Sequence, residues 1–360
     1  MQKRGATPAA LGFRMPAEWE PHRATWLAWP HEPTDWPGKL ATIPWVFAEI
    51  ARQLARAELV RLIVASAGEE RRARRVLEKA HVDLGRVEFF RSDTNRSWTR
   101  DSLPLFVVRK SGRKHEVAAV KFRFNAWARY PNHQKDERAG QRVGGWLGLR
   151  EFRPTAALGK RREPVVLEGG AIDVDGQGTL LATEECLLSG QFARNPELGR
   201  ERTERIFFDY LGVTKVIWLG RGVAGDDTTG HVDDFVRFVA PGKVVVCEEP
   251  NRRDANHSAL AEARQRLSSM RDARGRKLEV QTLPMPAPLY YGGQRLPASY
   301  ANFYVANGVV LVPTFNDPSD REALGRLAEL FPGRRVVGIH AVDLVLGLGT
   351  LHCSTQQEPR

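Results

Sequence analysis

The sequence has few cysteines for its length: only Cys186, Cys247 and Cys353 occur in 360 residues. Three cysteines are too few to staple a chain of this size, which excludes a disulfide-framework protein. No stretch approaches the ~20 apolar residues that a membrane-spanning helix needs. The first residues also lack the apolar segment of about 7–15 residues that marks a signal peptide. We therefore expect a soluble cytoplasmic protein with no membrane partner.

The sequence also lacks an uninterrupted run of five or six like charges, although its balance is strongly basic. Lys and Arg number 54 against 43 Asp and Glu, a formal net charge of +11, and the excess is mostly arginine scattered along the chain. Nucleic-acid-binding tails usually show such runs. We interpret the excess as a solvated surface and expect no nucleic-acid partner. A basic nucleic-acid-binding protein stays open as the rival hypothesis.

Strand and helix patterns alternate along the chain, which predicts an α/β fold. The β-branched run at 59–66 predicts a buried strand, and charged helices are expected near 68–80 and 197–211. Residues 235–249 predict a hairpin around Pro-Gly, and Ser319 with Glu322 predicts a capping box that opens a helix.

The domain boundaries follow from the absence of a Ser/Gly-rich linker. We predict a single domain over residues 15–360, preceded by a loose extension over residues 1–14. Met15 is an alternative start of translation.

Cys353 stands in a setting that suits a nucleophile. It lies in GLGTLHCSTQQEP, where two glycines allow the backbone to present a thiol at a pocket. The alternative is a buried inert cysteine. Cys186 and Cys247 lie in apolar, strand-like segments, and we expect both to be inert.

His231 and Asp233 lie two residues apart in GDDTTGHVDDFVRFV, after a turn. In a strand, this spacing places both side chains on one face. A histidine there can move protons and a carboxylate can hold a cation. A polar surface turn is the alternative. A zinc site formed by His231, His352 and Cys353 is a second one, but no spacing typical of zinc ligands supports it.

Trp98, Asp101 and Glu168 are three further candidate residues. Trp98 and Asp101 stand three apart in NRSWTRDSLPLFV, so a ring can stack on a flat cation whose N–H groups the carboxylate accepts. The alternative is a structural tryptophan beside a salt-bridged aspartate. Glu168 ends an apolar segment before Gly169-Gly170 and is either a buried functional acid or an edge residue.

Together these residues indicate chemistry on a guanidinium group. Carboxylates gathered around a thiol would repel a thiolate unless the substrate is a cation, and a guanidinium matches carboxylates in pairs. A thiolate can attack its central carbon, while a histidine protonates the leaving ammonia and then activates water.

The candidate residues recur at similar intervals. Asp101, Glu168 and His231 are separated by 67 and 63 residues, and Cys353 lies 122 residues further on, which is twice 61. About five units arranged around an axis would bring one loop of each to a common centre.

At these motifs the sequence resembles the agmatine deiminases, within the guanidine-modifying enzymes that include peptidylarginine deiminases and arginine deiminase. The resemblance runs almost end to end. Its segments are MPAEWEPHRATWLAWP (15–30), SWTRD (97–101), LEGGAIDVDGQGTLLATEECLLS (167–189), GDDTTGHVDD (225–234), PASYANFYVANGVVLVPTFNDPSD (297–320) and GTLHCSTQQEP (349–359).

The resemblance implies a role for each candidate side chain. Cys353 would be the nucleophile that carries the amidino group, and His231 the general acid and base, oriented by Glu168. Asp101 and Asp233 would grip the guanidinium, with Trp98 packing beside it.

The resemblance also implies a single-domain, five-bladed α/β propeller of the pentein type with pseudo-fivefold symmetry. The expected reaction is hydrolysis of agmatine to N-carbamoylputrescine and ammonia, with no cofactor and no metal. A deiminase of peptidylarginine or of another guanidine is the alternative, and a homodimer is a family-level expectation.

The sequence departs from the family pattern in two respects. Leu348 and Thr350 interrupt the glycine run that commonly precedes the catalytic cysteine, which predicts an altered loop that keeps the nucleophile. The net charge is positive, whereas relatives are often acidic. We expect the acidic residues of segment 226–234 to dominate the field at the pocket.

Overall fold

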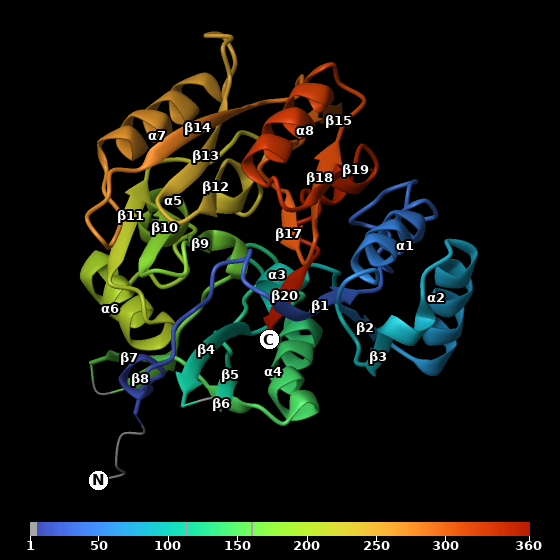
Figure 1. Ribbon diagram of the computed structural model, residues 1–360, viewed down its shortest axis with the longest axis horizontal. Coiled ribbons are helices and arrows are strands. Elements are labelled where there is room, and N and C mark those ends of the chain that lie inside the picture. The colour runs from blue at the N-terminus through green and yellow to red at the C-terminus, as the bar shows by residue number, and fades with distance from the viewer. Residues whose placement is uncertain (1–5, 113, 160) are drawn as a thin grey trace.

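The computed structural model describes residues 6–112, 114–159 and 161–360, and five β-sheets of three or four strands hold most of its strands. Each sheet combines an antiparallel pair with a parallel neighbour, and at least one helix connects the two parallel strands. Parallel strands need such a crossover. In the described residues the elements follow one another as strand–strand–helix–strand in four of these sheets, and in the fifth the antiparallel partner strand comes from the other end of the described chain (Figure 1).

The sheets are described here in the spatial order of their strands. The first contains β20 (Gln356–Pro359), β1 (His22–Ala28), β2 (Leu59–Val64) and β3 (Val87–Arg91). The second contains β4 (Leu105–Ser111), β5 (Lys114–Val120) and β6 (Arg150–Phe152), and the third β11 (Lys215–Leu219), β10 (Thr179–Thr183) and β9 (Ile172–Val174). The fourth contains β12 (Val236–Ala240), β13 (Lys243–Glu248) and β14 (Glu279–Pro284). The fifth contains β17 (Tyr304–Ala306), β18 (Val309–Thr314) and β19 (Arg335–His340). Two small hairpins pair β7 (Thr155–Leu158) with β8 (Arg161–Pro164) and β15 (Tyr290–Tyr291) with β16 (Gln294–Arg295).

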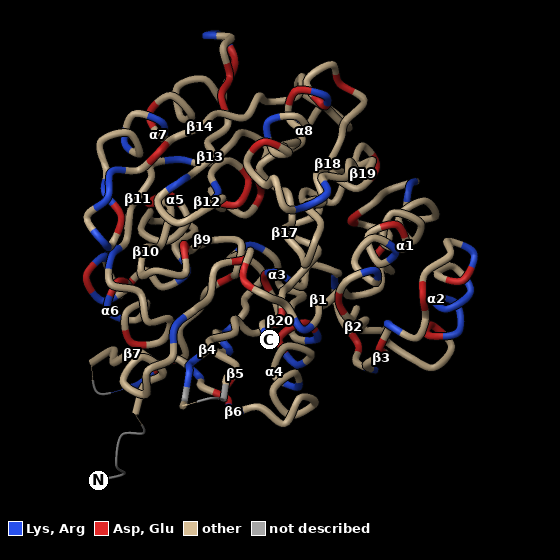
Figure 2. The backbone as a smooth tube through the Cα atoms, viewed as in Figure 1, with Lys and Arg blue, Asp and Glu red and all other residues tan. Residues whose placement is uncertain are grey.

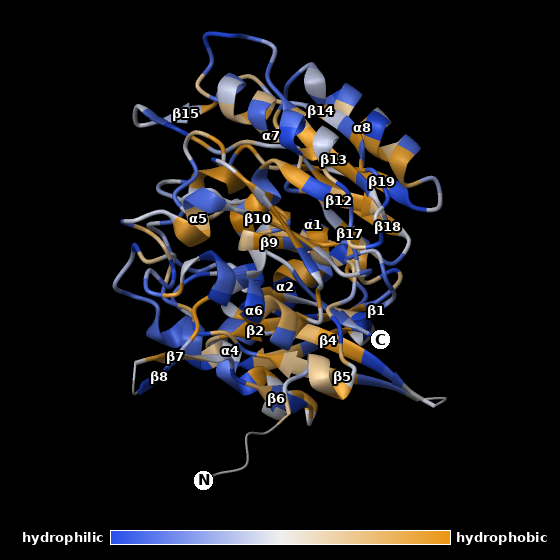
Figure 3. Cartoon of the chain, turned by 90° about the vertical axis from the view of Figure 1, so that its left-hand side faces the viewer, coloured by the Kyte–Doolittle hydropathy of each residue, from blue (hydrophilic) through white to orange (hydrophobic). Residues whose placement is uncertain are grey.

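The longer helices lie at the rim (Figure 1). The strands towards the middle are β20, β4, β9, β12 and β17, one from each sheet. Helix α1 buries Ile43, Phe47, Ile50 and Leu54, which recur at helical spacing along one face. Figure 3 shows hydrophobic residues concentrated along the inner strands. The helices are α1 (Ile43–Leu54), α2 (Ala67–Lys79), α3 (Thr99–Ser102), α4 (Gln134–Leu147), α5 (Glu184–Leu188), α6 (Gly199–Leu211), α7 (His257–Ser269) and α8 (Ser319–Leu330).

The mixed α/β fold of one domain is confirmed, as are the elements predicted near 59–66, 68–80, 197–211 and 235–249, which are β2, α2, α6 and the β12–β13 hairpin. The capping box was wrong: α8 begins at Ser319, and no side chain caps it at Pro318. Asp317 instead accepts the Ser319 N–H at 2.8 Å.

The prediction of a loose extension over residues 1–14 is corrected for residues 6–14. Phe13 is buried in an apolar cluster, and Arg14 exchanges two backbone hydrogen bonds with Val108. Apolar burial and backbone pairing both fix this segment to the domain. Residues 1–5 lie outside the described part of the chain.

The basic excess is spread over the molecule rather than gathered at one element (Figure 2). Many arginines pair with neighbouring acids, as in Arg52–Glu49 and Arg326–Glu322. This agrees with the interpretation of a solvated, mixed-charge surface. No helix in the described residues is both long and apolar enough to cross a membrane.

A buried carboxylate joins the inner ends of four sheets. Glu18 Oε1 forms an ion pair with Arg237 Nη2 at 2.9 Å and accepts from the Val305 N–H at 2.8 Å. Its Oε2 lies 2.7 Å from His352 Nε2 and 3.2 Å from Arg100 Nη2. Burial opposes charge on Glu18, but Arg237, His352 and Arg100 outweigh it and hold its pKa well below the ordinary range. These segments carry the residues of the central cavity described below.

We predict that Glu18→Gln lowers the free energy of unfolding by about 3–5 kcal/mol, because the buried cations lose their shared anion. The matched control is Glu279→Gln, which removes the exposed partner of Lys243 and should cost less than about 1 kcal/mol. Urea denaturation measures both variants. Equal losses would contradict the central role of Glu18.

Candidate active site

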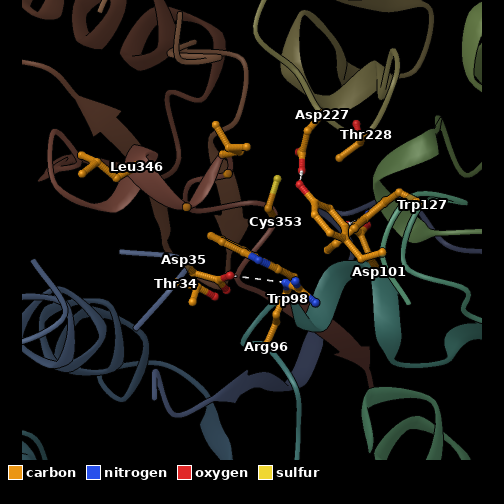
Figure 4. A pocket seen from close by; sticks show the side chains of 14 residues that line it. Thr34, Asp35, Arg96, Trp98, Asp101, Trp127, Asp227, Thr228, Leu346 and Cys353 are labelled. Carbon is orange, nitrogen blue, oxygen red and sulfur yellow. Dashed lines mark hydrogen bonds and ion pairs between the residues drawn. The ribbon is translucent and has the colours of Figure 1, made fainter. Parts of the chain in front are cut away.

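A cavity of about 210 Å³ opens beside the sulfur of Cys353 near the middle of the molecule (Figure 4). Segments from several sheets line it, which places distant parts of the chain around one small space. The lining comes from residues 34–35, 96–101, 127–130, 227–228 and 346–353.

The loop before Cys353 leaves no room for side chains at two glycines. A Cβ on Gly349 would lie 3.0 Å from the Cβ of Cys353 and from the ring of Trp98. A Cβ on Gly347 would lie 2.7 Å from Trp98. Leu348, between them, takes the left-handed conformation with φ 66°. The loop thus has glycines where Cys353 and Trp98 approach most closely, and a leucine in the left-handed conformation between them.

Asn302, which no sequence motif indicated, contacts the sulfur of Cys353. It precedes β17, and its Nδ2 lies 3.2 Å from Cys353 Sγ and 3.0 Å from Asp234 Oδ1. Its Oδ1 accepts from Thr350 Oγ1 and from the His352 N–H. The Asn302 amide therefore fixes both the sulfur and the turn that carries it.

The acids around Cys353 keep its sulfur protonated. Asp233 Oδ2 lies 3.7 Å from Sγ. Burial, then Asp233, Asp234 and Asp101, raise the pKa of the Cys353 thiol well above its usual range, and the Asn302 hydrogen bond offsets only part of this. The pocket therefore contains a thiol until a cation enters.

Asp233 is fixed through one oxygen and left open at the other. Its Oδ2 lies 2.5 Å from His352 Nδ1, while Oδ1 is buried without a hydrogen-bond partner among the described residues. Burial opposes its charge, but His352 and His231 hold the pKa of Asp233 below the ordinary value. An ionised carboxylate with Oδ1 unpartnered suits a guanidinium N–H.

His231 is fully buried among carboxylates. Its Nδ1 lies 3.9 Å from both Asp101 and Asp233, and its Nε2 lies 3.6 Å from Glu168. A Cβ on Gly170 would lie 2.6 Å from Nδ1, so that position must stay small. Burial opposes charge on the ring, but Asp101, Glu168 and Cys186 hold the pKa of His231 well above its ordinary value.

Asp233 and His231 do not lie on a strand, which corrects the predicted reason for their proximity. His231 precedes the short 3-10 helix η4 (Val232–Asp234), and β12 begins only at Val236. The two side chains converge because one tight turn carries both.

Arg194 supports Glu168 from behind and was also missed from sequence. Its Nε donates to both Glu168 oxygens at 3.0 Å, and its Nη2 donates to the backbone oxygen of Thr228. Burial raises the pKa of Glu168, but the opposite effect of Arg194 and His231 is larger. The pKa is therefore below its ordinary value and the carboxylate is ionised. An ionised Glu168 favours the protonated form of His231.

Two tryptophans line the cavity beside Asp101. Trp98 packs against Trp36 at 5.6 Å between ring centroids, and Trp127 donates its indole N–H to Asp101 Oδ2 at 2.9 Å. The Gly170 N–H reaches Asp101 Oδ1 at 3.1 Å. Burial raises the pKa of Asp101 to about 6, against the pull of His231.

The inertness of Cys186 and Cys247 stays a prediction, but the two thiols differ in where they lie. The Cys186 sulfur lies within 4.8 Å of ligand atoms of His231 and Glu168, so this thiol borders the site. Its apolar sequence context hid that contact because only the fold brings the three residues together. Cys247 lies next to Ser299, outside the cavity lining.

Two groups of described residues place three candidate metal-ligand atoms within 4.8 Å of one another: Glu168, Cys186 and His231, and Asp233, Asp234 and Cys353. Protein partners already engage the first through Arg194 and the second through His352. The zinc set of His231, His352 and Cys353 is not among these groups, because both ring nitrogens of His352 face carboxylates. We assign no metal to either group.

The structure brings together all six residues selected from sequence: Cys353, His231, Glu168, Asp101, Asp233 and Trp98. Asn302, Arg194, Trp127 and Cys186 complete the arrangement. A thiol, a charged imidazole and several carboxylates around a small cavity can bind a planar cation and transfer protons to and from it.

Comparisons with known proteins agree along the whole chain. A family model described as Porphyromonas-type peptidyl-arginine deiminase matches residues 14–359. The agmatine deiminase of Pseudomonas aeruginosa (strain LESB58) is 38% identical over 377 residues, covering 98% of this chain and 97% of that protein.

Solved structures give the same result. The agmatine deiminase of Enterococcus faecalis aligns with a TM-score of 0.89 and 34% identity over 99% of this chain and 98% of its own. The C. jejuni agmatine deiminase with substrate bound aligns with a TM-score of 0.83 and 27% identity over 97% of this chain and 96% of its own. The chain belongs to the family of Porphyromonas-type peptidyl-arginine deiminases.

Proposed function

We propose that this chain is an agmatine deiminase, a hydrolase that converts agmatine to N-carbamoylputrescine and ammonia. One observation supports this most strongly: a buried cysteine thiol lines a small cavity that the carboxyl groups of Asp35, Asp101 and Asp227 also line. A diamine-like cation with a guanidinium at one end matches that distribution of acids. Full-length similarity to agmatine deiminases supports the same substrate.

Substrate binding and activation of the thiol are linked by charge. Before binding, Asp101 and Glu168 face the cations His231 and Arg194, and Cys353 is a neutral thiol. An entering guanidinium adds one positive charge among the acids. Release of the thiol proton to solvent water restores the balance, so the substrate itself favours the nucleophilic thiolate.

The reaction then proceeds in two stages. The Cys353 sulfur forms a bond to the guanidinium carbon, and the carbon–nitrogen bond breaks as His231 gives a proton to the departing ammonia. Neutral His231 next takes a proton from water, whose oxygen attacks the amidino carbon. The carbon–sulfur bond breaks, which leaves a ureido product and free Cys353. Asp101 and Asp233 hold the guanidinium N–H groups, Glu168 orients His231, and Trp98 packs beside the planar group.

The arrangement of the five sheets supports the finer proposal of a five-bladed α/β propeller with pseudo-fivefold symmetry. Asp101, Glu168, His231, Asn302 and Cys353 each lie in the segment that enters the first strand of one sheet. Five equivalent entry segments would converge on an axis and build the site from one residue or pair each.

We expect Cys353→Ala to abolish ammonia release from agmatine, with a loss of at least roughly a thousandfold, because the covalent route is removed. The control is Cys247→Ser, which should stay within about twofold of the wild type because it leaves the cavity unchanged. The assay compares agmatine with L-arginine and an N-blocked arginine amide. Full turnover by Cys353→Ala contradicts the mechanism, and preference for the blocked amide indicates a peptidylarginine deiminase instead.

The pH dependence of kcat/KM should be bell-shaped. Asp101 must be ionised to hold the guanidinium, and its pKa of about 6 predicts that activity falls as the pH drops through that value. His231 must be protonated to release ammonia, and its raised pKa places the basic limb above neutral pH. A flat profile between about pH 5 and about pH 10 would rule out these assignments.

Asp227 predicts selectivity for a substrate that carries an ammonium group, as agmatine does. Asp227 lines the cavity and accepts from Tyr130 at 2.6 Å. Burial raises the pKa of Asp227 to about 6, so it is ionised at pH 8. At pH 8, Asp227→Asn should raise KM for agmatine about tenfold, yet change KM for n-butylguanidine, which lacks the ammonium, by less than about twofold. Equal changes for both compounds would place the ammonium elsewhere.

A further inference from the structure

Three consecutive residues before α4 adopt a left-handed backbone although none is glycine. The φ angles of Ala126, Trp127 and Ala128 are 51°, 59° and 56°. L-residues visit this region singly at turns, and a run of three is held only where surrounding contacts enforce it. Such strain is concentrated at functional sites.

Local contacts hold this left-handed turn in place. Asn125 Oδ1 accepts the Ala128 N–H at 2.9 Å, and the Tyr130 N–H reaches the Ala126 carbonyl oxygen at 3.2 Å. The Trp127 ring meets Phe124 and Tyr130 edge to face, at centroid distances of 5.3 and 5.9 Å. The aromatic contacts fix where the indole points.

The turn delivers the indole N–H of Trp127 to the Asp101 carboxylate. The Trp127 ring is buried, lines the cavity, and its Nε1 lies 2.9 Å from Oδ2. Among the described residues, this N–H and that of Gly170 are the two hydrogen-bond donors to the Asp101 side chain. One donor on each oxygen fixes the plane of the carboxylate.

We propose that Trp127 is a positioning residue for the reaction, which aims the Asp101 carboxylate at the guanidinium, and that the strained turn at 126–128 serves to place it. This inference rests on the proposed function for its kinetic consequence only. Its structural part, the support of the Asp101 anion by an indole N–H, holds whichever guanidine is the substrate.

The first experiment replaces the donor and keeps an aromatic ring. Trp127→Phe should move the acid limb of kcat/KM for agmatine upward by about one pH unit, because a hydrogen bond to a charged acceptor is lost. The other groups that face Asp101, namely His231, Asp233, Glu168 and Cys353, are unchanged. Loss of packing alone would instead lower kcat/KM by the same factor at every pH, and that result overturns the proposal.

A second readout does not depend on turnover. The ¹³Cγ resonance of Asp101, assigned by its absence in Asp101→Asn, should titrate about one unit higher in Trp127→Phe than in the wild type. An unchanged titration overturns the inference even if agmatine is a substrate. A shifted titration without turnover of agmatine upholds it and refutes only the proposed substrate.

The matched variant for the backbone is Ala128→Gly, since glycine adopts positive φ freely. It should raise Tm by about 1–3 °C, because relief of strain outweighs the added freedom of the unfolded chain, and leave the acid limb in place. A fall in Tm overturns the assignment of strain. If Trp127→Phe alone does not fold, the double variant with Ala128→Gly carries the pH and ¹³C measurements.

Discussion

The buried carboxylate of Glu18 is the interaction on which the arrangement of the site depends. It meets Arg237, His352, Arg100 and the Val305 N–H, which enter from four sheets. Arg100 and His352 are next in sequence to Asp101 and Cys353, while Arg237 and Val305 lie three residues from Asp234 and Asn302, which support the site. Apolar packing is not directional, whereas the hydrogen bonds and ion pairs of a carboxylate are. The contacts of Glu18 therefore set how the inner segments of the four sheets are oriented towards one another.

The chemistry is consistent with this construction because charge is balanced before the substrate arrives. His352 connects the two systems: one ring nitrogen faces Glu18 and the other faces Asp233, two residues beyond His231. The basic surface, with a net charge of +11, plays no part in this local balance. The basic residues are spread over the molecule (Figure 2), while the acids near the cavity lie within a few ångströms of one thiol.

Much of the site was predictable from sequence because its charged residues sit beside glycines and turns. Cys353, His231, Glu168 and Asp101 were recognisable in this way, and their spacing indicated about five units. Asn302 fills the position that the spacing left vacant between His231 and Cys353. As an uncharged amide inside SYANFY it gave no chemical signal. Arg194 was one arginine among 43, and Trp127 one aromatic residue in a segment whose backbone conformation no pattern announced.

The pairing of β20 with β1 joins residues more than 300 positions apart in the chain. Cys353 stands three residues before β20, so the sulfur is held in place only once that strand has found its partner. Asp101 and Asp233, which we propose hold the guanidinium, both precede Cys353 in the chain. The proposed nucleophile is therefore made after them, and its position depends on a contact between the two most distant strands of the described chain.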